Sequence, residues 1–151
     1  MECVNFFLHT SSSSTTSKNM TILYSLIARK KSVLAEHTSS TGNFPTVTRV
    51  LLAKIPEHDS KMSYVYDMYV FHYIVDQGII FLCMSDENTK RRLAFSFLDD
   101  IKGLWRERFS ATEQTAIAFS MNESFSPVLK ARIVRTLYCS SIYTLHLHSC
   151  I

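Results

Sequence analysis

A hairpin-like segment at residues 69–84, YVFHYIVDQGIIFLCM, constrains the fold more than any other part of this sequence. It predicts two strands, 69–75 and 79–84, joined by a tight turn in which Gly78 supplies the permissive backbone. Nearly every residue on both sides of the turn is apolar or aromatic, whereas a strand with one face in water alternates apolar and polar residues. We therefore expect other parts of the chain to cover both faces of this hairpin.

Three further segments have the pattern of strands. The almost continuous apolar run at 22–28 predicts a central strand, because both of its faces need burial. Segments 33–38 and 61–66 are more polar, and the second begins with a lysine, so both are expected nearer an edge. Together with the hairpin they predict a five-stranded antiparallel, meander-like sheet.

Three helices are expected to supply the covering layers. The first, 43–55, ends at the residue before a proline. The second, 89–109, has an apolar stripe and directs charged side chains such as Arg106 to solvent. The third follows a loop at 110–122 and runs over 126–137, where Ser-Pro is a typical helix start. The sequence thus predicts an α+β fold with one helix on one face of the sheet and two on the other.

The two ends of the chain lack the pattern of a packed domain. Residues 1–19 contain a Ser/Thr run that cannot bury enough surface to offset the entropy of ordering, so a disordered extension is expected. Residues 138–151 carry no Asp, Glu, Lys or Arg and are expected to be an atypical tail without an assignable structure. The predicted domain is therefore 20–137.

Composition argues against several classes of function. A net charge of +3 that is spread along the chain argues weakly against a dedicated nucleic-acid binder, and no nucleic-acid partner is expected. Common phosphate and zinc motifs are absent, the four cysteines show no paired spacing, and no apolar run approaches the length of a membrane span. We expect a reduced, soluble, cytoplasmic monomer with no cofactor and no small-molecule substrate.

Several polar residues are of types that serve as catalytic groups in enzymes. His72 lies inside the apolar hairpin with no nucleophile or carboxylate near it in sequence, so a hydrogen-bonded core histidine is expected and not a catalytic base. The adjacent carboxylates Asp86 and Glu87 suit a helix start, and Asp99 and Asp100 suit a solvated helix face. No catalytic residue is predicted.

Two other groups suggest ligands only weakly. His146, His148 and Cys150 alternate on one segment, but a zinc site needs a fourth ligand or a water and none is identified, so no metal site is predicted. The run at 90–92, Lys-Arg-Arg, is expected to be solvated, and a weak contact with an anionic membrane surface is the alternative.

Seven segments occur in a familiar order along most of the chain. They are ILYSLIAR, VLAEH, GNF, LAKIP, FHYI…IIFLCMSD, AFSFLDDIK and AFSMNESFSPVL. Together they resemble the longin domain of the tetanus-insensitive, synaptobrevin-like vesicle SNAREs (vesicle-associated membrane proteins), over about residues 20–133. The resemblance implies a profilin-like α-β-α sandwich that regulates a vesicle-fusion protein.

The sequence departs from that family in two ways. Family members continue with a coiled-coil fusion motif and a membrane anchor, which holds them on the cytosolic face of vesicle and endosomal or lysosomal membranes. No heptads follow Ile133, so both are expected to be missing here. Lys30 and the pair Asp67-Met68 replace glycine-containing turns of the family, and these turns are expected to be built differently.

The resemblance also implies a partner-binding groove between the first helix and the third strand. Its expected lining residues are Val47, Leu51, Ile55, Met62, Tyr64 and Tyr66. In the family, such a groove accepts the protein's own SNARE motif or a segment of a coat adaptor. The alternative is that Met62 and Tyr64 merely pack on the helix as core.

The function implied is that of a regulatory, non-enzymatic protein-binding domain in vesicle-mediated transport, membrane fusion and exocytosis. A small longin-fold subunit of a coat adaptor or of a vesicle-tethering complex is the alternative. Exposure of the groove would favour the first function, and a groove covered by another subunit would favour the second.

Overall fold

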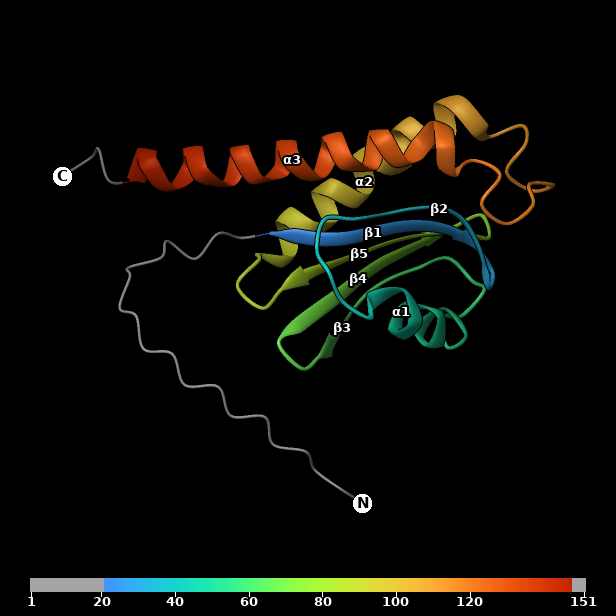
Figure 1. The fold of residues 1–151 in the computed structure, drawn as a ribbon, viewed down its shortest axis with the longest axis horizontal. Coiled ribbons are helices and arrows are strands. Elements are labelled where there is room, and N and C mark those ends of the chain that lie inside the picture. The colour runs from blue at the N-terminus through green and yellow to red at the C-terminus, as the bar shows by residue number, and fades with distance from the viewer. Residues whose placement is uncertain (1–20, 148–151) are drawn as a thin grey trace, which may run out of the picture.

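The computed structural model describes the backbone of residues 21–147 and the side chains as far as Cys139. Within these residues it contains five strands and three helices (Figure 1). The strands are β1 (Ile22–Arg29), β2 (Ser32–Thr38), β3 (Ser60–Tyr66), β4 (Tyr69–Asp76) and β5 (Ile79–Asp86), and the helices are α1 (Phe44–Leu52), α2 (Arg91–Phe109) and α3 (Asn122–Leu147). The expected disordered extension, 1–19, and residues 148–151 of the expected tail lie outside the described part, so the domain limits stay predictions.

The sheet is antiparallel, with the strand order β2-β1-β5-β4-β3. β1 pairs with β5 from Ile22 opposite Ser85 to Arg29 opposite Ile79, so the sheet is not the simple meander that the sequence predicts. This pairing brings together the two strands that need burial on both faces. The central place of β1 and the edge places of β2 and β3 are confirmed.

Left-handed backbone closes all three hairpin turns. Gln77 and Gly78 both have positive φ, 50° and 78°, as a type I′ turn requires. Lys30 and Asp67 have φ of 54° and 55°. These two residues therefore adopt the left-handed conformation themselves, which costs roughly 1–2 kcal/mol for a residue other than glycine.

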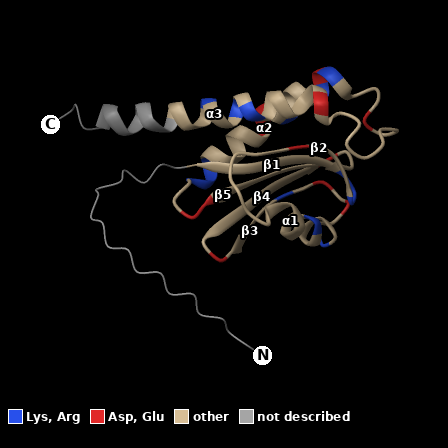
Figure 2. Ribbon diagram, viewed as in Figure 1, with Lys and Arg blue, Asp and Glu red and all other residues tan. Residues whose placement is uncertain are grey.

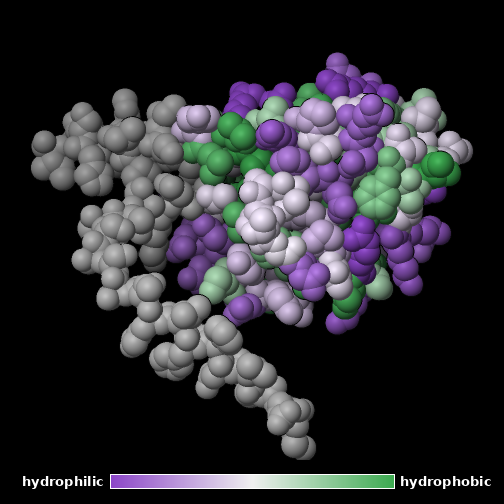
Figure 3. All heavy atoms as spheres, viewed as in Figure 1, coloured by the Kyte–Doolittle hydropathy of each residue, from purple (hydrophilic) through white to green (hydrophobic). Residues whose placement is uncertain are grey.

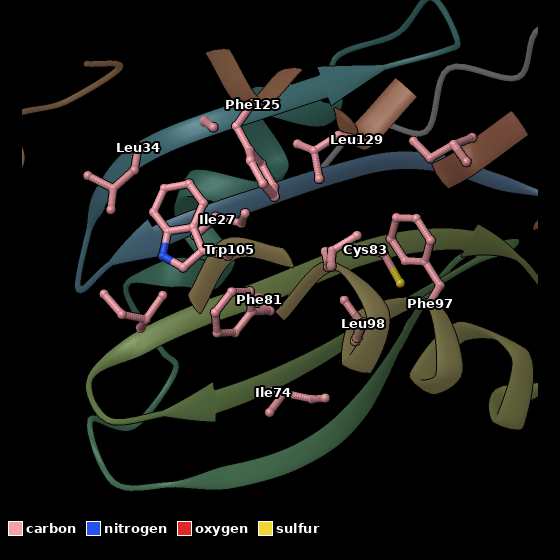
Figure 4. Close-up of a cluster of buried hydrophobic side chains, with 14 of the residues drawn as sticks. Ile27, Leu34, Ile74, Phe81, Cys83, Phe97, Leu98, Trp105, Phe125 and Leu129 are labelled. Carbon is pink, nitrogen blue, oxygen red and sulfur yellow. The ribbon is translucent and has the colours of Figure 1, made fainter. Parts of the chain in front are cut away.

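Two hydrophobic cores lie on opposite faces of the sheet, as the continuous apolar strands predict. α2 and α3 cover one face, where Phe81 and Cys83 of β5 meet Trp105, Leu98 and other buried residues of the two helices (Figure 4). α1 covers the other face, where Leu52 packs with strand residues such as Tyr24, Leu26, Phe71, Leu82 and Met84. The predicted distribution of one helix and two helices on the two faces agrees with this arrangement.

The helix limits differ from the sequence prediction for local reasons. α1 ends at Leu52 and not at 55. The Lys54 N–H donates to the carbonyl of Leu51, three residues earlier, at 2.9 Å, so the chain forms a 3₁₀-type turn here and does not continue the α-helix. α2 begins after Thr89, whose N–H and hydroxyl both donate to the Asp86 carboxylate, at 2.8 and 2.7 Å. This carboxylate holds the connection to α2 in a turn.

α3 is longer than predicted at both ends. It begins at Asn122, so Pro127 lies inside the helix and the prediction of a start at Ser126 is wrong. The buried Phe125 holds the preceding turn by packing on Trp105, with ring centroids 5.0 Å apart. The helix then continues to Leu147, beyond the predicted end at 137.

The prediction that Arg106 faces solvent is also wrong. Its guanidinium pairs with Glu113 and donates to the carbonyl and the carboxylate of Asp76, at 2.6 and 2.9 Å. Glu113 is buried and accepts a further hydrogen bond from Trp105 Nε1 at 2.7 Å. These interactions attach the loop between α2 and α3 to the end of β4.

We expect the core between the sheet and α2 to contribute strongly to stability. Phe81 is 0% exposed and Phe97 is 3% exposed, so replacing either by alanine should lower the free energy of unfolding by about 3–5 kcal/mol. Urea denaturation followed by circular dichroism measures the change. The control is Ile117→Ala, which removes an apolar side chain that is 75% exposed and should change stability by less than about 0.5 kcal/mol. Equal, small changes in all three variants would contradict this description of the core.

Candidate functional site

β3 presents an unpaired edge of the sheet. Within the described part of the chain it pairs only with β4, from Tyr66 opposite Tyr69 to Ser60 opposite Val75. Because the pairing begins across a two-residue turn, alternate residues from Tyr66 backwards bond to β4, and those between them direct N–H and C=O groups away from the sheet. The outward-directed residues are Lys61, Ser63 and Val65.

A hollow of about 170 Å³ lies between α1 and this edge strand. Its lining residues are Val47, Val50, Leu51, Lys54, Tyr64 and Tyr66. All are apolar or aromatic except Lys54, which is exposed. We call these six residues the α1–β3 groove. Figure 3 shows apolar residues, in green, interspersed with hydrophilic ones on the surface of the molecule.

The structure brings together four of the six residues that were predicted to line the groove: Val47, Leu51, Tyr64 and Tyr66. Met62 shares their face of β3, but its sulfur accepts a hydrogen bond from the Tyr73 hydroxyl at 3.5 Å and it does not line the hollow. Ile55 lies beyond the end of α1 and lines a separate hollow of about 70 Å³.

Sequence reasoning missed Val50 and Lys54. Both lie beside the apolar stripe of α1, and Val50 follows Val47 by one helical turn, which is the signal that could have found it. The alternative in which Met62 and Tyr64 are ordinary core is wrong, because they are 52% and 49% exposed. Whether the groove binds a partner stays a prediction.

Polar contacts on the other side of α1 fix its position on the sheet. The Tyr24 hydroxyl donates to the Glu36 carboxylate, which also pairs with Arg49 of α1 at 3.7 Å. Burial, and then the bond to Glu36, raises the pKa of the Tyr24 phenol far above its usual value, so the phenol stays protonated. α1 is thereby joined to β1 and β2, and its opposite side remains available beside β3.

His72 is a core residue, as predicted. It is 2% exposed, and its ring nitrogens bond to Ser63 Oγ at 2.8 Å and Ser85 Oγ at 3.2 Å. Burial, and to a lesser extent the nearby charge of Arg91, lowers the pKa of His72 to about 4. The ring is therefore neutral near pH 7 and joins β3, β4 and β5 through the two serines.

The carboxylates of α2 have structural partners. Asp99 pairs with Lys61 and Lys102, at 3.5 and 3.6 Å, and Asp100 pairs with Arg132 at 3.2 Å. These contacts agree with the interpretation of a charged, solvated helix face. They join α2 to the edge strand on one side and to α3 on the other.

The described residues contain neither a metal-binding cluster nor a membrane-spanning helix. Among those residues no group of three His, Cys, Asp or Glu side chains could hold a metal ion. The side chains of His146, His148 and Cys150 lie outside the described part. No helix within 21–147 is long and apolar enough to cross a bilayer.

A sheet covered on both faces, with a half-exposed apolar groove beside an unpaired strand edge, has the features that strand addition of a peptide requires. The chain belongs to the longin family, because the model of that family, described as a regulated-SNARE-like domain, matches residues 34–129. The resemblance found from the sequence is confirmed. Longin domains of SNAREs are regulators and not enzymes, which agrees with the interpretation of this chain as non-catalytic.

Curated relatives come from distant organisms. The chain is 51% identical to vesicle-associated membrane protein 7B of Dictyostelium discoideum over 111 residues, which is 74% of this chain and 43% of the relative. It is 40% identical to vesicle-associated membrane protein 7 of Mus musculus over 114 residues, and 42% identical to vesicle-associated membrane protein 711 of Arabidopsis thaliana over 115 residues. Each of these two matches covers 76% of this chain and 52% of the relative. The chain thus matches about half the length of these relatives.

The depressed pKa of His72 predicts a pH dependence of stability. An unfolded histidine has a pKa of about 6.5, so between that value and about 4 the unfolded chain binds more protons than the folded chain. His72 should therefore lower stability as the pH falls through this range, by at most about 1.4 kcal/mol per pH unit.

Urea denaturation of the wild type and of His72→Gln at several pH values measures this contribution. The glutamine can bond to the same serines but does not titrate, so its stability should decline less steeply in acid. Parallel curves for the two proteins, or an NMR titration of the His72 ring with a pKa near 6.5, would contradict the interpretation.

Proposed function

We propose that this chain is the regulatory longin domain of a vesicle SNARE and acts in vesicle-mediated transport, membrane fusion and exocytosis. In this proposal the α1–β3 groove and the edge of β3 bind a SNARE motif, and a coat-adaptor segment is a competing ligand of the same type. The observation that carries the proposal is the apolar hollow directly beside an unpaired strand. Family membership and the names of the relatives support it.

The chemistry of the groove favours a peptide over a small molecule. Its volume of about 170 Å³ is below the roughly 300–1,000 Å³ of typical ligand pockets but suits an apolar side chain of a peptide. The outward N–H and C=O groups of Lys61, Ser63 and Val65 offer hydrogen bonds to an added strand, while Tyr64 and Tyr66 offer apolar contact. The exposed Lys54 of the lining favours an acidic residue in the peptide.

Regulation would follow from competition for this groove. A SNARE motif held by the longin domain is not free to enter a fusion complex, and a second ligand of the groove releases it. We further propose that the domain is a monomer in the absence of a ligand and acts at the cytosolic face of vesicle or endosomal membranes. The alternative of an adaptor or tether subunit has less support, since the relatives reported above are all vesicle-associated membrane proteins.

Replacing exposed groove residues should remove binding without unfolding the domain. Val50 is 57% exposed and Tyr64 is 49% exposed, so Val50→Ser combined with Tyr64→Ser should cost little stability. We expect the double variant to bind a SNARE-motif peptide from a related protein at least about tenfold more weakly, because it lacks apolar surface that the peptide would bury. Isothermal titration calorimetry measures the affinity.

The matched control is Tyr138→Ser combined with Ile117→Ser, which likewise removes one tyrosine and one aliphatic side chain; these are 68% and 75% exposed and lie outside both the groove and β3. Its affinity should equal that of the wild type. Unchanged affinity in the groove variant would refute the proposed site. A large loss of stability in the groove variant would instead indicate that Val50 and Tyr64 contribute to the core.

A further inference from the structure

A second concave surface lies on the face of the sheet opposite α1. Two hollows, of about 510 and 270 Å³, meet at Ser96 on the outer side of α2. The first lies between β3 and α2, and the second lies between α2 and α3. Their basic lining residues are Lys61, Arg91, Arg92, Arg132 and Arg135. We call these five residues, together with Ser96, the basic groove.

Positive charge exceeds negative charge in the basic groove. The acidic residues that line it are Asp99 and Asp100, and each is already paired, with Lys61 and Arg132 respectively. Arg92 and Arg135 have no ion pair or hydrogen bond within the described residues, although each lies in a hollow that includes Ser96. Figure 2 shows Lys and Arg, in blue, at the start of α2 and along the part of α3 above it.

Packing holds some of these cations close together. The Lys61 ammonium lies 4.5 Å from the centre of the Phe95 ring, and the Arg91 guanidinium lies 5.6 Å from it. One aromatic ring thus holds cations from β3 and α2 near each other, where their repulsion would be relieved by a bound anion. His72, which packs against the edge of the same ring, is neutral and adds no charge.

We propose that the basic groove binds the headgroup of a membrane lipid that carries more than one phosphate. Four of its five cations are arginines, whose planar guanidinium groups form paired hydrogen bonds with phosphate. The two hollows are shallow and open to solvent, so a headgroup at a membrane surface can reach them.

The side chains beside the groove suit a membrane surface. On α3, Val134 and Tyr138 are 40% and 68% exposed, and Tyr138 lies one helical turn beyond Arg135. Tyrosine is favoured at the membrane–water interface, where its ring and hydroxyl meet apolar and polar surroundings. This surface and the α1–β3 groove lie on opposite faces of the sheet, and Lys61 of β3 contributes its backbone to the strand edge and its side chain to the basic groove.

Vesicle co-flotation of the purified chain tests the proposal. One vesicle population contains phosphatidylcholine with phosphatidylinositol bisphosphate, and a second contains phosphatidylcholine with enough phosphatidylserine to give the same total negative charge. We expect clearly stronger binding to the first, because clustered phosphates fit the hollows. Equal binding to both populations would overturn the proposed headgroup site, and so would an absence of binding to either.

Two pairs of variants make the test specific. Arg92→Gln combined with Arg135→Gln removes two unpaired cations of the groove, and should weaken binding to phosphoinositide vesicles by about 25-fold, since each such residue contributes about fivefold. Arg108→Gln combined with Lys130→Gln makes the same change of charge outside the groove, on exposed residues of α2 and α3, and should change binding less than about twofold. Equal losses in both pairs would overturn the proposal. Soluble inositol phosphate that binds as tightly as the vesicles would overturn the assignment to a membrane lipid.

Discussion

The burial of β1 and β5 on both faces is the constraint on which the rest of the structure depends. Their side chains alternate between two cores, so helices are needed above and below the sheet. The few polar groups that enter these strands are paired, as when Ser25 Oγ donates to the Leu82 carbonyl at 2.9 Å. The short helix α1 covers the central strands on its side but leaves β3 half exposed. The candidate peptide groove is thus a consequence of how the central strands are covered.

The parts of the fold that local patterns determine could be predicted from the sequence. The apolar runs gave the central strands, and the helical stripe of α2 correctly included Ala94, Leu98 and Trp105. The pairing of β1 with β5 could not be predicted in this way, because it joins segments that are distant along the chain. The same holds for Arg106, whose partners Asp76 and Glu113 lie on separate elements.

The two candidate binding surfaces differ in the same respect. Strand alternation predicted that Tyr64 and Tyr66 share a face, and helical spacing placed Val47 and Leu51 on one stripe, but only the family resemblance predicted that the two sets line one groove. The basic groove has no such sequence signal, because Lys61, Arg92 and Arg135 come from three elements that only the tertiary structure brings together. Sequence patterns alone predicted a solvated charge run at the start of α2, with a weak contact with an anionic membrane surface as the alternative. The structure adds the concave surface and the unpaired arginines.

The central claim is that the unpaired edge of β3 and the hollow beside it form one peptide-binding site. Amide hydrogen exchange of β3, measured by NMR with and without a SNARE-motif peptide, tests this claim most directly. The account predicts that the amides of Lys61, Ser63 and Val65 exchange rapidly in the free domain and become protected on binding, while those of Met62 and Tyr64, which bond to β4, are protected in both states. Protection that the peptide induces elsewhere, with the three outward amides unchanged, would contradict the account.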